Sequence, residues 1–371
     1  MTPVAGETFD TTGLTVVPGL VDLQVNGAAG VDLSSEPERL WDVAAHLPRH
    51  GVTSFLPTVV STDAGVRDRA LCALAAGPPP DGVVRATPIG LHFEGPMLSP
   101  ERRGAHPAEA LRPPSPELVA GWTPERGVVM ATIAPELPGA PEVIRLLAGR
   151  GVVVSIGHTA ATLAQVDAAV AAGARAVTHL YNTMPGLGHQ EPGPVGAALS
   201  GGDLVCGVIV DGLHVHPRTV AATWRALGPD RFLAVSDTTA ALDLPPGPAR
   251  LGRHEVVVDG GAVRLASDGV TLAGSAVGLD DCLRRLVEYT GCTPAEAVAT
   301  ATAVPARLFP GLLARNTGDT RDTTLLDADL RVAATVVGGR IAYDRDGRAG
   351  GPPRADRGPA PEPGAEVSWR S

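Results

Sequence analysis

The chain has 371 residues, which allows one large α/β domain or two domains of ordinary size. Its formal net charge of −10 argues against a nucleic-acid partner, because binding a polyanion favours a basic surface. No apolar run approaches the ~18 residues of a membrane-spanning helix, so no membrane partner is expected.

The chain begins with "MTPVAGETFD", which lacks the basic and apolar segments of a signal peptide. The four cysteines show no C-x-x-C spacing and are interpreted as reduced thiols. We therefore expect a cytoplasmic protein. All 30 basic residues are arginine, and the absence of lysine excludes both a Schiff-base lysine and a carboxylated lysine between two metals.

Eight short, β-rich apolar runs follow one another along the chain. They cover 20–26, 52–60, 83–93, 128–134, 152–158, 176–182, 204–214 and 232–238. Ala-rich helical segments lie between them, such as 162–174, where Leu163, Val166 and Val170 share one helical face. This alternation predicts parallel strands buried on both faces. A doubly wound sheet is the alternative, but eight successive units favour an α/β fold closed into a (β/α)8 TIM barrel.

The last third of the chain changes character. The stretch 253–269, "RHEVVVDGGAVRLASDG", predicts a hairpin. The stretch 293–309 predicts one helix, with Thr293 as N-cap and Pro294 at the first helical position. The stretch 323–344 alternates like two antiparallel strands.

These patterns predict a division of the chain into three parts. Residues 19–311 form the catalytic barrel, and residues 1–18 together with 312–347 form a small β appendage. Residues 348–371 are rich in proline and glycine and are expected to be disordered.

Ionisable side chains close five of the eight runs. They are Glu94, His158, His179, the pair Asp211 and His214, and Asp237. The carboxyl ends of barrel strands form the active site, and buried ionisable groups are costly unless they are paired or bound to a metal. A catalytic site at this end of the barrel is therefore predicted.

Glu94, His158 and His179 supply one carboxylate and two imidazoles, a ligand set that leaves an open position for water on Zn²⁺ or Fe²⁺. Asp237 is predicted to be the general acid and base. His106 and His214 are candidates for steadying an oxyanion, with a purely structural role as the alternative of equal weight.

The other histidines are assigned lesser roles. His92 neighbours Glu94 and is interpreted as a supporting or structural residue. Surface or local-packing positions are predicted for His46, His50, His189, His216 and His254.

Several motifs, taken together, are those of one family. They include "PGLVDLQVNGAAGVDL", "GLHFEGPMLSPERRGAH", "SIGHTAAT", "THLYNTMPGL", "DGLHVHP", "VSDTTAA" and "TLAGSAVGLDDCLRRLV", in family order. The chain thus resembles the N-acetylglucosamine-6-phosphate deacetylases of the amidohydrolase superfamily, from about residue 18 to residue 345.

The resemblance implies a fold, a metal and a set of substrate contacts. Gln24 and Asn26 stand where some members carry two imidazoles, which implies one metal instead of two. It also implies a homodimer and a small β-sandwich. Only 18 residues precede Gly19, so we expect either that this sandwich is abridged or that the start codon is misassigned. The implied substrate contacts are Ala105, His106, Asn182, Thr183, Asp211, Gly212, Leu213, His214, Leu272, Ala273 and Gly274.

One departure concerns the substrate phosphate. The family places an arginine just before "EPG", where it binds the phosphate, and this chain has Gln190 there. We therefore expect weaker selectivity for a 6-phosphate.

Three functions remain open on the sequence. The leading one is removal of the N-acetyl group from N-acetylglucosamine-6-phosphate, giving glucosamine-6-phosphate and acetate. The second keeps this chemistry on a non-phosphorylated or differently substituted amino sugar or aminocyclitol in a specialised biosynthetic pathway. The third, a catalytically silent binding protein, is disfavoured because Glu94, His158, His179 and Asp237 are all intact.

Overall fold

The computed structural model of the chain describes residues 8–251, 254–313, 322–348 and 368–370. Its centre is a barrel of parallel strands. These are β3 (Leu20–Val25), β6 (Val52–Val60), β8 (Leu91–Glu94), β9 (Val128–Ile133), β10 (Val153–Ile156), β11 (Ala176–Val177), β12 (Val205–Ile209) and β13 (Phe232–Val235). Seven of these strands lie within the predicted runs, and β8 extends one residue beyond the third run, 83–93, which also contains β7 (Thr87–Pro88).

The strands pair in chain order from β3 to β13. A parallel bridge between Val25 and Thr238 joins the first strand to the end of the last, and the Asn26 amide donates to the Thr238 carbonyl at 2.8 Å. This seam closes the sheet, so the prediction of a (β/α)8 barrel is confirmed and a doubly wound sheet is excluded.

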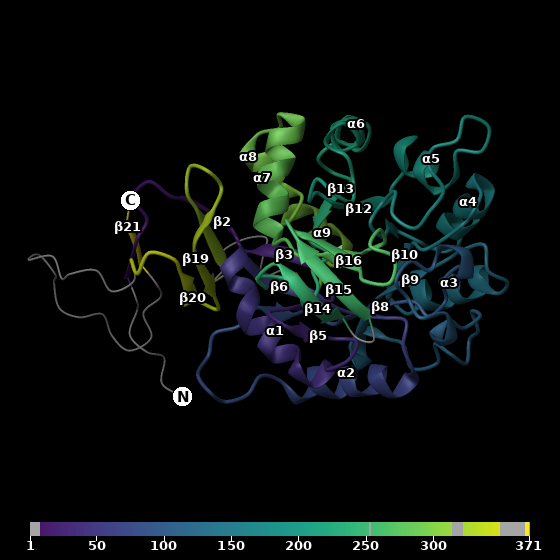
Figure 1. Cartoon of the computed structure of the whole chain (residues 1–371), viewed down its shortest axis with the longest axis horizontal. Coiled ribbons are helices and arrows are strands. Elements are labelled where there is room, and N and C mark those ends of the chain that lie inside the picture. Colours follow the sequence, from purple (N-terminus) through teal and green to yellow (C-terminus); the bar gives the residue numbers. More distant parts are fainter. Residues whose placement is uncertain (1–7, 252–253, 314–321, 349–367, 371) are drawn as a thin grey trace, which may run out of the picture.

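Helices surround the strands, as Figure 1 shows. The α-helices are α1 (Leu40–His46), α2 (Ala64–Ala76), α3 (Ala140–Gly149), α4 (Leu163–Ala172), α5 (Gly193–Leu199), α6 (Pro217–Leu227), α7 (Leu279–Thr290), α8 (Pro294–Ala299) and α9 (Ala303–Leu308). The 3₁₀ helices are η1 (Pro37–Arg39), η2 (Leu47–His50), η3 (Pro100–Arg102), η4 (Ala108–Ala110) and η5 (Pro124–Arg126). Helix α4 packs with Val166 fully buried, as its periodicity predicted.

The single helix predicted over 293–309 is wrong, because the structure breaks it into α8 and α9. Thr293 caps α8 as predicted. Pro305 has no N–H to bond the Ala301 carbonyl one turn earlier. That carbonyl instead accepts from the Val21 amide of β3 at 2.8 Å, so the break ties the helices to the first barrel strand.

An antiparallel sheet lies across the barrel strands in the view of Figure 1. It contains β14 (Gly247–Leu251), β15 (His254–Asp259), β16 (Ala262–Leu265) and β17 (Leu272–Ser275). Strands β15 and β16 are the predicted hairpin. A bridge between Thr238 and Ser275 attaches β17 to the end of β13.

A second antiparallel sheet has the order β2-β18-β19-β20. It joins β2 (Thr15–Pro18), β18 (Thr323–Leu326), β19 (Val332–Val337) and β20 (Arg340–Asp344), and it lies to the left of the barrel strands in Figure 1. The prediction of two strands over 323–344 is wrong. There are three, because Gly338 and Gly339, at φ 59° and 78°, turn the chain back once more.

The remaining short strands form two pairs. These are β4 (Gly27–Ala28) with β5 (Val31–Asp32), and β1 (Thr8–Asp10) with β21 (Ser368–Arg370). The predicted disordered tail over 348–371 lies mostly outside the described residues. The domain boundaries at 18, 311 and 347 stay a prediction.

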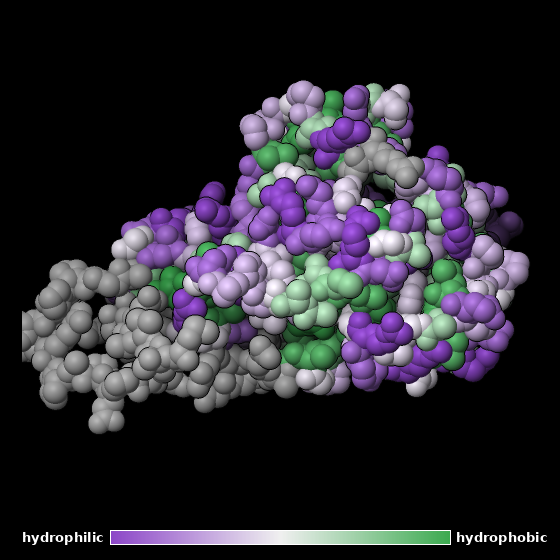
Figure 2. All heavy atoms as spheres, turned by 90° about the horizontal axis from the view of Figure 1, so that it is seen from below, coloured by the Kyte–Doolittle hydropathy of each residue, from purple (hydrophilic) through white to green (hydrophobic). Residues whose placement is uncertain are grey.

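The face seen from below mixes hydrophilic residues with a smaller hydrophobic area (Figure 2). Some exposed apolar area is normal on the surface of a folded protein. Among the described residues, no helix has both the length and the apolar character needed to cross a membrane.

Candidate active site

Three side chains from three strand ends meet at the mouth of the barrel. Glu94 is the last residue of β8, while His158 and His179 each lie two residues beyond the end of β10 and β11. Glu94 Oε1 lies 3.1 Å from His158 Nε2 and 3.0 Å from His179 Nε2, and the two Nε2 atoms are 3.1 Å apart. All three residues are buried. The predicted metal ligands are therefore brought together with their donor atoms facing one another.

The backbone turns sharply to achieve this. His158, His179 and Asp237 have φ values of 48°, 28° and 49°. Side chains other than glycine rarely adopt this left-handed region, which costs of order 1–3 kcal/mol per residue and is typical of functional sites. The strain aims each side chain across the mouth of the barrel.

Neighbouring groups fix the orientation of the ligands. His158 Nδ1–H donates to the Arg102 carbonyl at 3.0 Å, which leaves Nε2 free to bind a metal. The Gln24 side-chain amide donates to Glu94 Oε1 at 3.4 Å. Burial raises the pKa of Glu94, but the His158 and His179 imidazoles that face its carboxylate hold this pKa well below its usual range. A buried carboxylate facing two imidazoles is a donor set suited to a divalent cation.

Asp237 follows β13 and lies beside this cluster. Its Oδ1 accepts from the Asn26 side-chain amide at 2.8 Å. Burial, reinforced by the charge of Glu94, raises the pKa of Asp237 to about 7. Gly274 packs against it: a Cβ there would lie 2.9 Å from the Asp237 carbonyl oxygen. A carboxyl poised near neutrality is suited to exchange protons with a reacting group.

His106 is a neutral hydrogen-bond donor in this arrangement. Its Nδ1 accepts from the Ser61 backbone amide at 3.1 Å, so the proton lies on Nε2. Burial and the neighbouring His158 lower the pKa of His106 to about 3. The His106 and His158 rings contact edge to face, with centroids 4.4 Å apart.

Asp211 and His214 form a buried pair after β12. Asp211 Oδ2 lies 2.6 Å from His214 Nδ1, and its Oδ1 accepts from the Leu213 and His214 amides, each at 2.8 Å. Asp211 therefore orients the His214 ring, with Nδ1 donating to the carboxylate and Nε2 left as the free nitrogen.

His92 lies beneath the site, inside the barrel. Its Nε2 is 2.8 Å from Thr132 Oγ1, and burial lowers its pKa to about 4. Thr132 continues the contact to Thr178 at 2.7 Å. His92 thus belongs to a buried polar layer that supports the strand ends.

A cavity of about 760 Å³ opens above these residues. Eight of the predicted substrate residues line it: Ala105, His106, Asn182, Thr183, His214, Leu272, Ala273 and Gly274. Four do not line it: Asp211, Gly212, Leu213 and Gln190. Gln190 is exposed to solvent on the segment before α5. The structure therefore does not bring it to the cavity.

The cavity is also lined by residues that were not predicted from the sequence. Ser61, Thr62 and Asp63 directly follow β6, so their place as polar residues at a strand end is the sequence signal that points to them. His254, predicted to be a surface or packing residue, lines the cavity from β15. Its position depends on how the sheet β14–β17 folds over the barrel, for which the sequence holds no local signal.

The sequence profile of the amidohydrolase family matches residues 15–311. The chain is 37% identical over 362 residues to human N-acetylglucosamine-6-phosphate deacetylase, covering 92% of this chain and 87% of the human protein. The chain belongs to the N-acetylglucosamine-6-phosphate deacetylase family of amidohydrolases. The resemblance stated from the motifs is confirmed.

Two further relatives bear on the site of this family member. An N-acetylgalactosamine-6-phosphate deacetylase from Escherichia coli O157:H7 is 37% identical, over 88% of this chain and 87% of that protein. A mutant N-acetyl-D-glucosamine-6-phosphate deacetylase from Mycobacterium smegmatis was solved in complex with N-acetyl-D-glucosamine-6-phosphate. It matches with a TM-score of 0.79 and 33% identity, covering 89% of this chain and 87% of that one.

Proposed function

We propose that the chain is a metal-dependent deacetylase that hydrolyses N-acetylglucosamine-6-phosphate to glucosamine-6-phosphate and acetate. The observation that carries this proposal is the meeting of Glu94, His158 and His179 beside Asp237 at the floor of the cavity. Relatives that share more than a third of the sequence and are named for this reaction support the substrate class.

One divalent metal, Zn²⁺ or Fe²⁺, would be held by Glu94, His158 and His179. Donor separations of 3.0 to 3.1 Å fit ligands around one small cation, whose metal–ligand bonds are ~2.0–2.2 Å. The Gln24 side chain is hydrogen-bonded to Glu94, and the Asn26 side chain is hydrogen-bonded to Asp237. This arrangement supports one bound metal rather than two. When bound, the metal would polarise the acetamide carbonyl and lower the pKa of a bound water.

Asp237 would move the protons. Its carboxylate takes a proton from the water that attacks the carbonyl carbon. It then delivers this proton to the amide nitrogen as the C–N bond breaks, releasing acetate and the free amine. Asn26 holds Oδ1 throughout, which leaves Oδ2 as the oxygen that carries the proton.

His106 and His214 would stabilise charge and orient the sugar. Both line the cavity, and each has one ring nitrogen fixed by a protein partner, Ser61 or Asp211. The free N–H of His106 is available to a substrate oxygen. Ala105, Asn182, Thr183 and the segment 272–274 would complete the substrate site.

The test uses purified protein and a panel of N-acetyl sugars, each with and without a 6-phosphate. Release of acetate and of a primary amine from N-acetylglucosamine-6-phosphate is expected. His179→Ala should abolish this activity and remove one tightly bound metal per chain in elemental analysis. An active His179→Ala protein, or a wild type inactive on every sugar of the panel, would refute the proposal.

A second candidate is deacetylation of a differently substituted amino sugar. Gln190 replaces the arginine expected to bind phosphate, and it lies outside the cavity. A lost charge-assisted contact would reduce affinity by roughly ten- to a hundred-fold. The kcat/KM ratio of phosphorylated over dephosphorylated substrate, measured before and after Gln190→Arg, distinguishes the candidates. If the wild-type kcat/KM ratio is above about a thousand and Gln190→Arg leaves it unchanged, the result supports N-acetylglucosamine-6-phosphate as the substrate.

We also propose that the enzyme is a cytoplasmic homodimer. The resemblance to the family and the reduced thiols of Cys72, Cys206, Cys282 and Cys292 support this proposal. Sedimentation of the purified protein gives its oligomeric state.

A further inference from the structure

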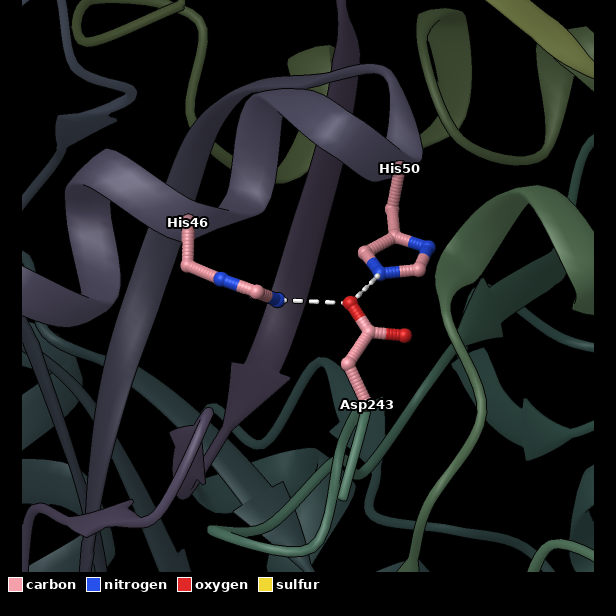
Figure 3. Close-up of side chains that lie close together, drawn as sticks. All are labelled: His46, His50 and Asp243. Atoms are coloured by element: carbon pink, nitrogen blue, oxygen red, sulfur yellow. Dashed lines mark hydrogen bonds and ion pairs between the residues drawn. The ribbon is translucent and has the colours of Figure 1, made fainter. Parts of the chain in front are cut away.

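A second cluster of metal-ligating side chains lies outside the cavity. His46 ends helix α1, His50 ends η2, and Asp243 lies in the loop after β13. Both imidazoles point at the same carboxylate oxygen (Figure 3). Asp243 Oδ2 lies 2.6 Å from His46 Nε2 and 3.0 Å from His50 Nε2, and all three donor atoms fall within 4.8 Å of one another.

The backbone is arranged around this cluster. The histidines are four residues apart, so a helical backbone places both on one face. Asp243 has a φ of 61°, the left-handed region that non-glycine residues rarely adopt. Gly278 makes room for the His50 ring, because a Cβ there would lie 2.1 Å from His50 Nδ1.

An outer layer of charges holds His50. Its Nδ1 is 3.0 Å from Asp280 Oδ1, and Asp280 Oδ2 accepts from Arg284 at 3.0 Å. A carboxylate on the far nitrogen of an imidazole is the usual support of a metal-bound histidine. The side chains of His46 and His50 are only 18% and 14% exposed, whereas that of Asp243 is 44% exposed. The two histidines are therefore held by surrounding protein, whereas the Asp243 carboxylate is accessible to water.

We propose that His46, His50 and Asp243 form a second divalent metal site, selective for a transition metal such as Zn²⁺ and completed by water. Two imidazoles and one carboxylate are ligands that such ions prefer, and exposed oxygens alone would suit Mg²⁺ or Ca²⁺ better. Around a tetrahedral zinc with ~2.0–2.1 Å bonds, donors lie ~3.3 Å apart. The exposed Asp243 carboxylate, at 2.6 Å from His46 Nε2 and 3.0 Å from His50 Nε2, therefore has to withdraw by roughly 0.7 Å from the first nitrogen and roughly 0.3 Å from the second.

The site joins the first and last units of the barrel. Helix α1 and η2 lie between β3 and β6, and Asp243 lies six residues after Asp237. The Leu242 and Ala240 carbonyls accept from Ala29 and Gly30 at 3.1 and 2.8 Å. A metal here fastens the loop that follows the catalytic acid to the helix that follows the first strand.

The same side chains also make an ion pair without metal. Burial alone lowers the pKa of His50, but hydrogen bonds to Asp243 and Asp280 raise it to about 9. A protonated His50 held by two carboxylates, with no affinity for metal, is the competing outcome that the experiment must separate.

The experiment is a Zn²⁺ titration, by calorimetry, of full-length protein with its catalytic site already loaded. The wild type should bind one further Zn²⁺ per chain. His46→Gln and Asp243→Asn should abolish this binding, and Asp280→Asn should weaken it about ten- to a hundred-fold. His189→Gln, which changes an exposed histidine elsewhere, should bind as the wild type does.

A second measurement locates the ion directly. Crystals of the wild type soaked in Zn²⁺ should give an anomalous peak at the zinc edge between His46, His50 and Asp243, and crystals of Asp243→Asn should not. The proposal is overturned if loaded wild type takes up no further Zn²⁺. It is equally overturned if the uptake survives both His46→Gln and Asp243→Asn, or if the cluster shows no peak.

Discussion

Gln24 and Asn26 each orient one carboxylate of the candidate active site. Both stand where imidazoles are expected, and both side-chain amides donate to carboxylates, to Glu94 at 3.4 Å and to Asp237 at 2.8 Å. An amide carries no charge and changes no protonation state at neutral pH. The two residues thus orient the carboxylates without competing for the metal proposed beside them.

Asp237→Asn should keep the metal and lose nearly all turnover. The leaving nitrogen must be protonated as the C–N bond breaks, and general acid–base catalysis contributes ~10²–10⁴-fold. Steady-state kcat and elemental analysis check this, with the exposed Asp203→Asn as control. Retention of more than about a tenth of wild-type kcat would assign the proton transfers elsewhere, with His214 the first residue to examine.

Asn26→Leu should lower kcat and leave the metal content unchanged. A hydrogen bond to a charged group contributes ~1.5–3 kcal/mol, so its loss should cost roughly ten- to a hundred-fold in rate. KM should change less than kcat, because Asn26 acts through Asp237 rather than through the substrate. A variant whose KM rises while its kcat is unchanged would instead place Asn26 in direct contact with the substrate.

At the level of elements, the barrel seam contains a buried carboxyl. The Asp22 side chain in β3 accepts a hydrogen bond from the backbone amide of Ser236, just beyond β13, at 3.3 Å. It accepts another from the backbone amide of Gln24 at 3.2 Å. Burial raises the pKa of Asp22 to about 6, although hydrogen bonds from Ser236 and Gln24 oppose the change. The seam is thus joined by a group that resists ionisation.

The free energy of unfolding of Asp22→Asn, relative to that of the wild type, should increase as the pH rises. The folded pKa of about 6 lies above the usual 3.8, so ionisation costs no folding free energy below pH 3.8 and its full amount above pH 6. Two pKa units correspond to about 3 kcal/mol. Urea unfolding of both proteins at pH 4, 5, 6 and 7 measures the difference. A constant difference across this range would show that Asp22 ionises normally in the folded protein.

At the scale of the whole molecule, the catalytic cluster links opposite sides of the barrel. Glu94, His158 and His179 come from β8, β10 and β11, and Asp237 from β13. A ligand that binds only the folded chain stabilises it by RT ln(1 + [L]/Kd), or about 4 kcal/mol at a thousand times Kd.

Removal of the catalytic metal should therefore lower the thermal midpoint by several degrees. Differential scanning calorimetry before and after chelation, and after adding Zn²⁺ back, measures the shift. The experiment is done in His46→Gln, so that the second site does not contribute. A His158→Ala protein in the same background should show no shift, and a shift of equal size there would place the stabilising metal elsewhere.

The sequence by itself determined the barrel and the residues at its strand ends. Apolar runs of strand length, separated by helical periodicity, encode parallel strands because burial on both faces is a local requirement. Glu94, His158, His179 and Asp237 close such runs, and the carboxyl ends of parallel strands meet at one rim. The family motifs then supplied the chemistry.

The tertiary structure alone decided which side chains meet. In one short loop His214 lines the cavity while Asp211 turns inward to hold it. His46 and His50 meet Asp243 across 197 and 193 residues of sequence. Such contacts arise from the closure of the barrel at β3 and β13, which brings distant segments together. Local sequence periodicity does not predict these contacts, because each partner alone has the sequence pattern of an ordinary polar surface residue.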